Sequence, residues 1–228
     1  MTYNILATGS SGNAVIINDS ILIDCGVPFK TLEPFVKDLR LVLLTHEHSD
    51  HFKPSTVKKL HKLRPALRFG CCEWMVRPLL EAGVDKRVID VYKVDLMKAY
   101  DGLAAIIPVS IPHDVPNCGY KILTERKSVL ETSHDGSIFY STDCATLDGI
   151  EAKFYELYMI EANHTQEEID ARISAKLAAG EYPYELEAKR NHLSQEQAMD
   201  WLAKNMGPHS KYVFLHQHKD KERSKIDD

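Results

Sequence analysis

The stretch LVLLTHEHSDH, residues 41–51, holds the densest group of potential metal ligands in the chain. Its four leading apolar residues predict a buried strand, and three histidines and an aspartate follow within six residues. Imidazole nitrogens and carboxylates are the usual ligands of zinc and similar divalent ions. Side chains of an extended chain repeat every second residue, so His46 and His48 can point the same way. Asp50 and His51 fall in the following turn, where they could serve a second ion.

The composition is typical of a globular domain rather than of a membrane or secreted disulfide-rich protein. The 228 residues are 44% hydrophobic and 27% charged. We expect residues 1–218 to form one domain and residues 219–228 to form a charged, frayed tail. The five cysteines contain no C-x-x-C pair, and neither a membrane-spanning run nor a signal peptide is apparent. These features predict a cytoplasmic protein without a membrane partner.

The pattern along the chain alternates runs of strands with helices. We predict strands at 3–7, 14–17, 21–23, 41–44, 103–109, 119–124, 137–140, 154–160 and 212–215. We predict helices at 31–37, 55–63, 73–82, 165–179 and 184–190, and one that starts at Ser194. This order favours one α/β domain whose sheets are largely antiparallel or mixed, rather than a regular βαβ winding.

Several predicted strands end in further potential ligands, as a binuclear metal site requires. Each ion needs about three or four protein ligands, and two ions about 3.5–4 Å apart usually share a carboxylate or a hydroxide. The inventory assigns His46, His48 and His113 to one ion, Asp50, His51 and His192 to the other, and Asp143 to a position between them. His216 and His218 alternate at the end of the last strand; we expect them at the surface and keep them as replacements for His192.

A basic segment follows the histidine cluster. Residues 52–70 contain no acidic side chain, and the candidates for contact with a phosphate backbone are Lys58, Lys59, Lys62 and Arg64. A solvated helix face explains the same charges equally well. The net charge of −5 means that a polyanionic substrate would need such a local positive field.

The segment THEHSDH resembles the H-x-H-x-D-H motif of the metallo-β-lactamase-fold hydrolases. Other segments occur in the order seen in the YycJ/WalJ-type nuclease subgroup, namely residues 9–13, 22–26, 112–114, 143, 161–164 and 191–194. The chain is also similar to the ribonuclease Z and ribonuclease J enzymes. The resemblance covers residues 3–205, although the ribonuclease J insertion domain has no room here and Cys144 is unusual after Asp143.

The resemblance implies an αββα four-layer sandwich with two divalent ions, Zn²⁺ or Mn²⁺, at one edge. It also implies an exonuclease-like phosphodiesterase acting on DNA or RNA, with the seven ligands as assigned above. Asp24 would lie beneath the ligands, and Glu161 and His164 would either lie near the scissile phosphate or orient ligands. Ser11 and Asn13 are further candidates for substrate contact.

As a hypothesis, a hydroxide between the ions attacks phosphorus, Asp50 orients it, and His164 or a metal-bound water protonates the leaving group. One alternative is a small-molecule ester, thioester or lactone hydrolase on the same fold. Those enzymes usually have a glycine-histidine-threonine turn where this chain has residues 112–115, PHDV. Another alternative is a metal-stabilised nucleic-acid-binding protein without turnover. The sequence leaves the choice of nucleic acid and the oligomeric state open.

Overall fold

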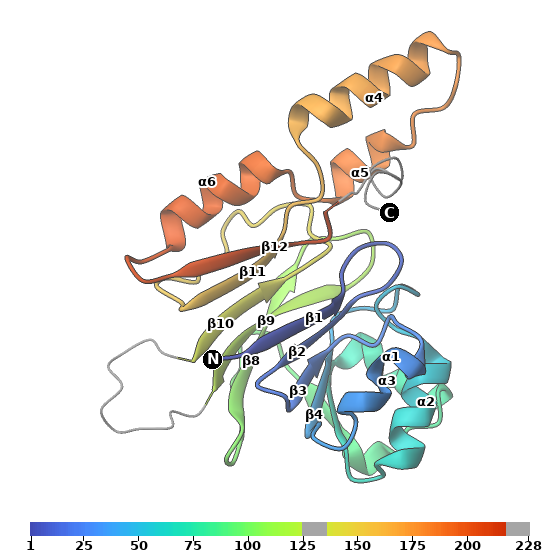
Figure 1. The fold of residues 1–228 in the computed structure, drawn as a ribbon, viewed down its shortest axis with the longest axis vertical. Helices are drawn as coiled ribbons and strands as arrows, with labels where there is room; N and C mark the ends of the chain where they lie inside the picture. The colour runs from blue at the N-terminus through green and yellow to red at the C-terminus, as the bar shows by residue number, and fades with distance from the viewer. Residues whose placement is uncertain (125–135, 218–228) are drawn as a thin grey trace.

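The computed structural model describes residues 1–124 and 136–217, so the predicted tail and His218 lie outside the described residues. Twelve strands form two six-stranded sheets in the described part of the chain (Figure 1). The first sheet has the order β1-β2-β3-β4-β5-β6, with strands Tyr3–Ala7, Ala14–Ile17, Ile21–Ile23, Leu41–Leu44, Arg68–Cys72 and Ile89–Tyr92. The second sheet has the order β12-β11-β10-β9-β8-β7. Its strands are β7 (Lys98–Tyr100), β8 (Ala104–Ile111), β9 (Asn117–Thr124), β10 (Ser137–Ser141), β11 (Leu157–Glu161) and β12 (Lys211–Leu215).

Both sheets are mixed, as the sequence predicted. Strands β3 to β6 run parallel to one another, β2 pairs antiparallel with β3, and β1 pairs antiparallel with β2. In the second sheet β10, β11 and β12 are parallel, whereas β7, β8, β9 and β10 pair antiparallel. The carboxyl ends of parallel strands meet at one edge of a sheet, so the residues that follow them come close together.

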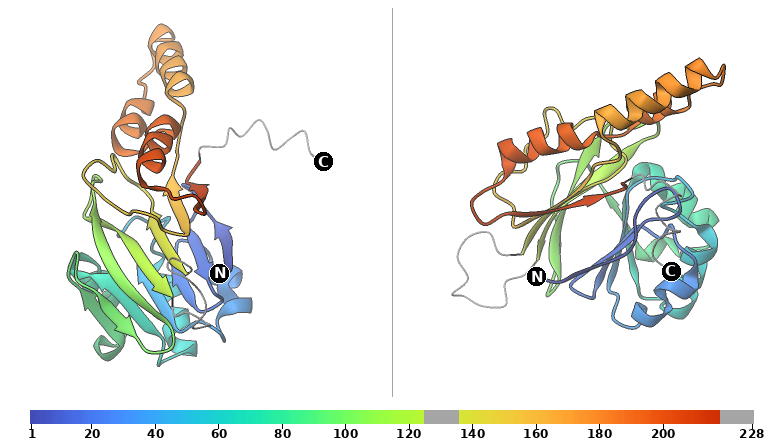
Figure 2. Two further views of the ribbon diagram at one scale, coloured as in Figure 1. Left: turned by 90° about the vertical axis from the view of Figure 1, so that its left-hand side faces the viewer. Right: turned by 45° about the horizontal axis from the view of Figure 1, so that its top comes forward.

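Alternation of side chains divides the core into layers. On β4, Leu41 and Leu43 pack between the two sheets, while Val42 and Leu44 pack against helices. Burial on both faces explains why this strand is a continuous apolar run. The helices of the described chain are α1 (Phe29–Leu32), α2 (Pro54–Leu63), α3 (Val76–Glu81), α4 (Gln166–Ala178), α5 (Glu185–Asn191) and α6 (Gln195–Asn205). Helices α1 to α3 cover the first sheet and α6 covers the second, which confirms the four-layer αββα sandwich (Figure 2).

Helices α4 and α5, which lie between β11 and α6 in the sequence, project beyond the sandwich as a helical arm (Figures 1 and 2). The side chain of Thr165 caps α4 by accepting from the backbone N–H of Glu168, and Ser194 forms a full capping box with Gln197 at the start of α6. His164 and Ser194 form a bridge at the base of the arm. None of the described helices is long and apolar enough to span a membrane.

Three strands, β5 to β7, were not predicted. Gly70 interrupts the pattern of β5 because the side chain of Tyr92 occupies the space that a Cβ at residue 70 would need. The predicted helix at 31–37 is instead the short α1 followed by a 3-10 turn at Glu33–Phe35. The strand predicted from residue 154 starts at Leu157, since Phe154 has a left-handed φ of 60°.

Candidate metal centre

The loop after β4 is held by Asp24, a fully buried residue directly after β3. Its carboxylate accepts hydrogen bonds from the backbone N–H of Thr45 at 3.0 Å and from the Thr45 hydroxyl. It also lies 2.7 Å from Nδ1 of His51. A proton on Nδ1 leaves the other ring nitrogen of His51 as a potential metal ligand. This is the position beneath the ligands that we predicted for Asp24.

The first group of ligands combines the two sheets. His46 and His48 come from the loop after β4, and His113 lies just after β8. Nδ1 of His48 is 3.2 Å from Nε2 of His46 and 3.4 Å from Nε2 of His113. The three imidazoles could therefore hold one ion.

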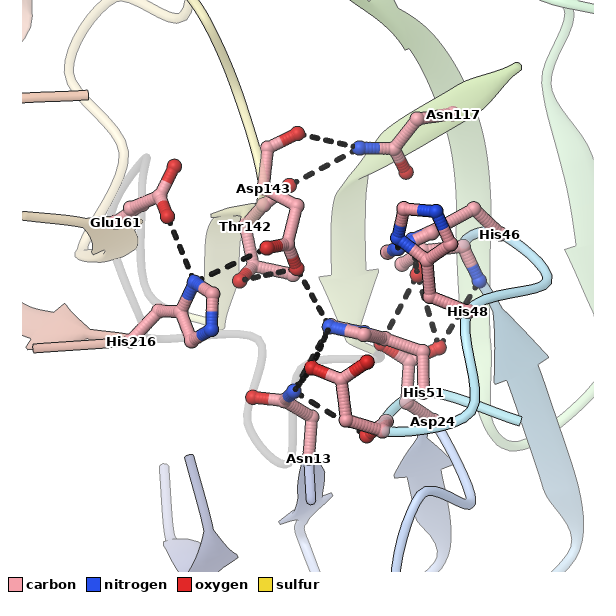
Figure 3. Close-up of polar contacts among 12 residues, drawn as sticks. Asn13, Asp24, His46, His48, His51, Asn117, Thr142, Asp143, Glu161 and His216 are labelled. Atoms are coloured by element: carbon pink, nitrogen blue, oxygen red, sulfur yellow. Dashed lines mark hydrogen bonds and ion pairs between the residues drawn. The ribbon is translucent and has the colours of Figure 1, made fainter. Parts of the chain in front are cut away.

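The second group joins His51 to Asp143, which follows β10. Nε2 of His51 is 2.5 Å from Oδ2 of Asp143, and His46 belongs to the same group (Figure 3). Burial opposes protonation of His51, but the carboxylates of Asp143 and Asp24 raise its pKa to about 10. In the absence of a cation, a protonated histidine supplies the positive charge that these buried carboxylates require.

The third group surrounds Glu161, which is completely buried at the end of β11. Its Oε1 lies 2.6 Å from Nδ1 of His192 and 2.7 Å from Nδ1 of His216. Burial would raise the pKa of Glu161, but these two histidines lower it. Glu161 thus orients two imidazoles, each of which keeps Nε2 for a metal or a substrate.

The position of His216 differs from the one expected from the sequence. It was expected at the surface, yet it is only 5% exposed, and its Nδ1 is 3.0 Å from Oδ1 of Asp143. The corresponding distance from His192 is 3.4 Å, and the side chain of His192 is 20% exposed. His216 therefore lies deeper in this group and nearer to Asp143, whereas His192 is the more exposed of the two histidines. A left-handed φ of 53° at His216, just past β12, accompanies this inward placement.

The donors fit divalent metal ions. Burial and the neighbouring His51 lower the pKa of His46 to about 2, so its ring is neutral and can donate a lone pair. Burial likewise lowers the pKa of His113, whose Nδ1 is buried and has no hydrogen-bond partner in the described chain. Neutral imidazoles with carboxylates are a donor set that suits zinc and manganese.

Asp50 and Asn13 lie beside these groups. Oδ2 of Asp50 is 3.6 Å from Nε2 of His51, a separation that two ligands of one ion can have. The Asn13 side chain is 2% exposed and contacts the carbonyl oxygen of Asp50 and the ring of His51. That placement favours support of the loop over the predicted contact with substrate. Ser11, the other predicted contact, is exposed nearby.

The remaining predicted residues lie outside the ligand groups. His164 is 7% exposed, contacts Asn163, and belongs to none of the metal-binding groups found among the described residues. Lys58, Lys59 and Lys62 are exposed on α2, which leads back from the loop to the start of β5. Arg64 is engaged elsewhere, since it donates to the carbonyl oxygens of Val36 and Lys37. The Cys144 thiol is buried in the apolar cluster under α6, and burial raises its pKa.

Comparison with known proteins identifies the family. The model described as the β-lactamase superfamily domain matches residues 19–216. The chain belongs to this superfamily. It is 28% identical to "Exodeoxyribonuclease WalJ" of Streptococcus pneumoniae, over 93% of this chain and 80% of that protein. The described fold and ligands make the chain a metal-dependent hydrolase of the metallo-β-lactamase fold.

Solved structures share the fold at low sequence identity. The short form of human tRNase Z is 14% identical with a TM-score of 0.70, covering 96% of this chain and 93% of that chain. The metallo-β-lactamase fold protein YhfI of Bacillus subtilis is 14% identical with a TM-score of 0.68, covering 97% and 88%. A diphosphatase of the PhnP family is 15% identical with a TM-score of 0.61, covering 98% and 90%.

Proposed function

We propose that this protein is an exonuclease that hydrolyses DNA phosphodiesters with two divalent ions, Zn²⁺ or Mn²⁺. The observation that carries the proposal is the chain of ligand groups, in which His46 links the first group to the second and Asp143 links the second to the third. The similarity to WalJ supports DNA as the substrate. RNA is the alternative nucleic acid, because the fold is shared with tRNase Z.

The proposed ligands divide into two sets that share Asp143. One ion is held by His46, His48 and His113, and the other by Asp50, His51 and His216, with His216 in place of the predicted His192. Such ions, when bound, lower the pKa of water and neutralise charge that develops on phosphate. Asp50, at the more open side of His51, is suited to orient a nucleophilic water.

His192 is a better proton donor to the leaving group than the predicted His164. Its Nδ1 is fixed by Glu161 at 2.6 Å, and its side chain is 20% exposed, so Nε2 can reach a bound substrate. Glu161 is buried and accepts hydrogen bonds from the backbone N–H groups of Cys144 and Leu193 as well. Of the two roles predicted for Glu161, we therefore propose the orientation of histidines, His192 among them, rather than contact with phosphate.

The test is a cleavage assay on end-labelled single- and double-stranded DNA and RNA with Zn²⁺, Mn²⁺ or Mg²⁺. We expect stepwise shortening of DNA and a loss of activity in Asp143→Ala. Asp148→Ala, an exposed aspartate in the same loop, is the matched control and should cleave normally. Equal cleavage by the wild type and Asp143→Ala would contradict the assigned site.

Two further outcomes would favour the alternatives. Hydrolysis of thioesters or lactones without cleavage of nucleic acid would indicate a small-molecule hydrolase. A gel shift with DNA but no products at any metal concentration would indicate a binding protein without turnover.

A further inference from the structure

Asn117 is a buried polar residue that sequence reasoning did not single out. It is the first residue of β9 and is 2% exposed. Strand β9 pairs antiparallel with β10, with Tyr120 opposite Tyr140. Continuation of this register by three residues places Asn117 opposite Asp143, just beyond the end of β10.

The Asn117 side-chain amide binds carbonyl oxygens just beyond the last residue of β10, where the hydrogen bonds between β9 and β10 end. Its Nδ2 donates to the carbonyl oxygen of Thr142 at 3.1 Å and to that of Asp143 at 2.8 Å (Figure 3). Buried carbonyl groups beyond a strand end need such partners. A planar amide carries two N–H donors, so one side chain can serve both carbonyls, which a hydroxyl with its single donor cannot do.

The turn that receives these bonds has an unfavourable backbone. Asp143 has a φ of 49°, in the left-handed region that L-residues rarely adopt. On the other side of the turn, the backbone N–H of Cys144 donates to Oε2 of Glu161 at 2.7 Å. The turn is therefore held from both sides, while the Asp143 carboxylate faces His51 and His216.

The other polar atom of the Asn117 side chain makes no such contact in the described part of the chain. Its Oδ1 is buried and has no hydrogen-bond partner within the described residues. Burial of an unpaired amide oxygen is unfavourable. The side-chain hydrogen bonds of Asn117 found among the described residues are therefore those of its N–H donors.

We infer that Asn117 is a positioning residue that sets the Asp143 carboxylate between the histidines of the two sheets for metal binding. The inference rests on the proposed function, in which Asp143 is a ligand. Asn117 acts through the backbone of the turn and contacts neither substrate nor metal. Loss of its donors lets the turn relax and moves the carboxylate away from His51 and His216.

The test compares Asn117→Ala with Asn205→Ala. Asn205 is also buried, at 4% exposed, and also fixes a loop: Oδ1 accepts from the backbone N–H of Ala152 at 3.0 Å, and Nδ2 donates to the carbonyl of Trp201 at 2.9 Å. Zn²⁺ and Mn²⁺ affinities are measured by chelator competition on metal-free protein, together with its Tm. Removal of a residue that supports metal ligands typically weakens binding about tenfold to a hundredfold.

We expect both variants to lower the Tm of the metal-free protein, but only Asn117→Ala to weaken metal binding about tenfold to a hundredfold. Asn117→Ser, which keeps one donor, should give an intermediate affinity. Wild-type affinity in a folded Asn117→Ala or Asn117→Ser overturns the inference. So does failure of both Asn117 variants to fold when Asn205→Ala folds. If the wild type itself binds no metal, the proposed function fails first.

Discussion

The carboxylate of Asp24 determines which nitrogen of His51 is available to a metal ion. In Asp24→Asn, the Oδ1 position can still accept from the backbone N–H of Thr45. The Oδ2 position, 2.7 Å from Nδ1 of His51, becomes an NH₂ group that can only donate. His51 must then accept at Nδ1 and carry its proton on Nε2, the nitrogen that faces Asp143. We therefore expect the substitution to weaken metal binding.

The magnitude follows from the partners that are lost. Loss of a carboxylate that orients a ligating histidine costs about tenfold to a hundredfold in affinity, which corresponds to about 1.4 to 2.7 kcal/mol. At a metal concentration about 1,000 times the wild-type Kd, binding stabilises the fold by about 4.1 kcal/mol. After a hundredfold loss the same concentration stabilises it by about 1.4 kcal/mol. For a chain of this size, the difference lowers the metal-induced rise in Tm by about 5–11 °C.

The assay is thermal denaturation with and without Zn²⁺ or Mn²⁺, supported by chelator competition. Asp90→Asn is the control, because Asp90 is also a buried carboxylate but pairs with Arg68, away from the ligands. The control should lower the Tm equally with and without metal. An unchanged metal-induced rise in Asp24→Asn would refute the tautomer argument.

Two further predictions concern His216 and Asp90. His216→Ala should lower the metal content measured by mass spectrometry, whereas His192→Ala should keep both ions and slow turnover about 10²- to 10⁴-fold; equal metal loss in both would contradict the assignment. Burial would raise the pKa of Asp90, but hydrogen bonds from Arg68 and Tyr100 lower it. Asp90 therefore contributes stability above the unfolded pKa of about 3.9, and loses it as the pH falls further. Unfolding in urea should show a deficit of about 1–3 kcal/mol for Asp90→Asn at pH 7, which shrinks below about pH 4; a deficit that grows in acid would be inconsistent with this.

Most of the sheet framework was predictable because burial on one or both faces leaves a clear pattern. Strands β1 to β4 and the later strands β8 to β12 were all expected, with some displaced ends. β5 and β6 lack that pattern, since each contains a residue whose presence in a buried strand is explained only by a side chain of the neighbouring strand. Gly70 makes room for Tyr92, and the buried Asp90 is paired with Arg68. Such pairs across strands leave no local signal in the sequence.

The grouping of the candidate ligands was predictable where they closely follow strands. His46, His48, His51, His113 and Asp143 lie together as expected from their places after β4, β8 and β10. His216 was expected elsewhere because β12 is partly exposed and resembles a surface strand. The missing information was the parallel register that puts Leu215 beside Glu161, and hence His216 beside that carboxylate. The alternation of histidines after β12 was the signal available.

The division of ligands between the sheets links metal binding to the stability of the whole sandwich. In the proposed assignment, the first sheet supplies His46, His48, Asp50 and His51, and the second supplies His113, Asp143 and His216. Each sheet alone offers too few donors for the proposed pair of ions. An ion bound by residues of both sheets therefore stabilises only states in which the two sheets are packed together. In those states the apolar cluster between the sheets, which includes Leu41 and Leu43, is buried. Metal should accordingly raise the free energy of unfolding for both sheets together, rather than stabilise the histidine loop alone.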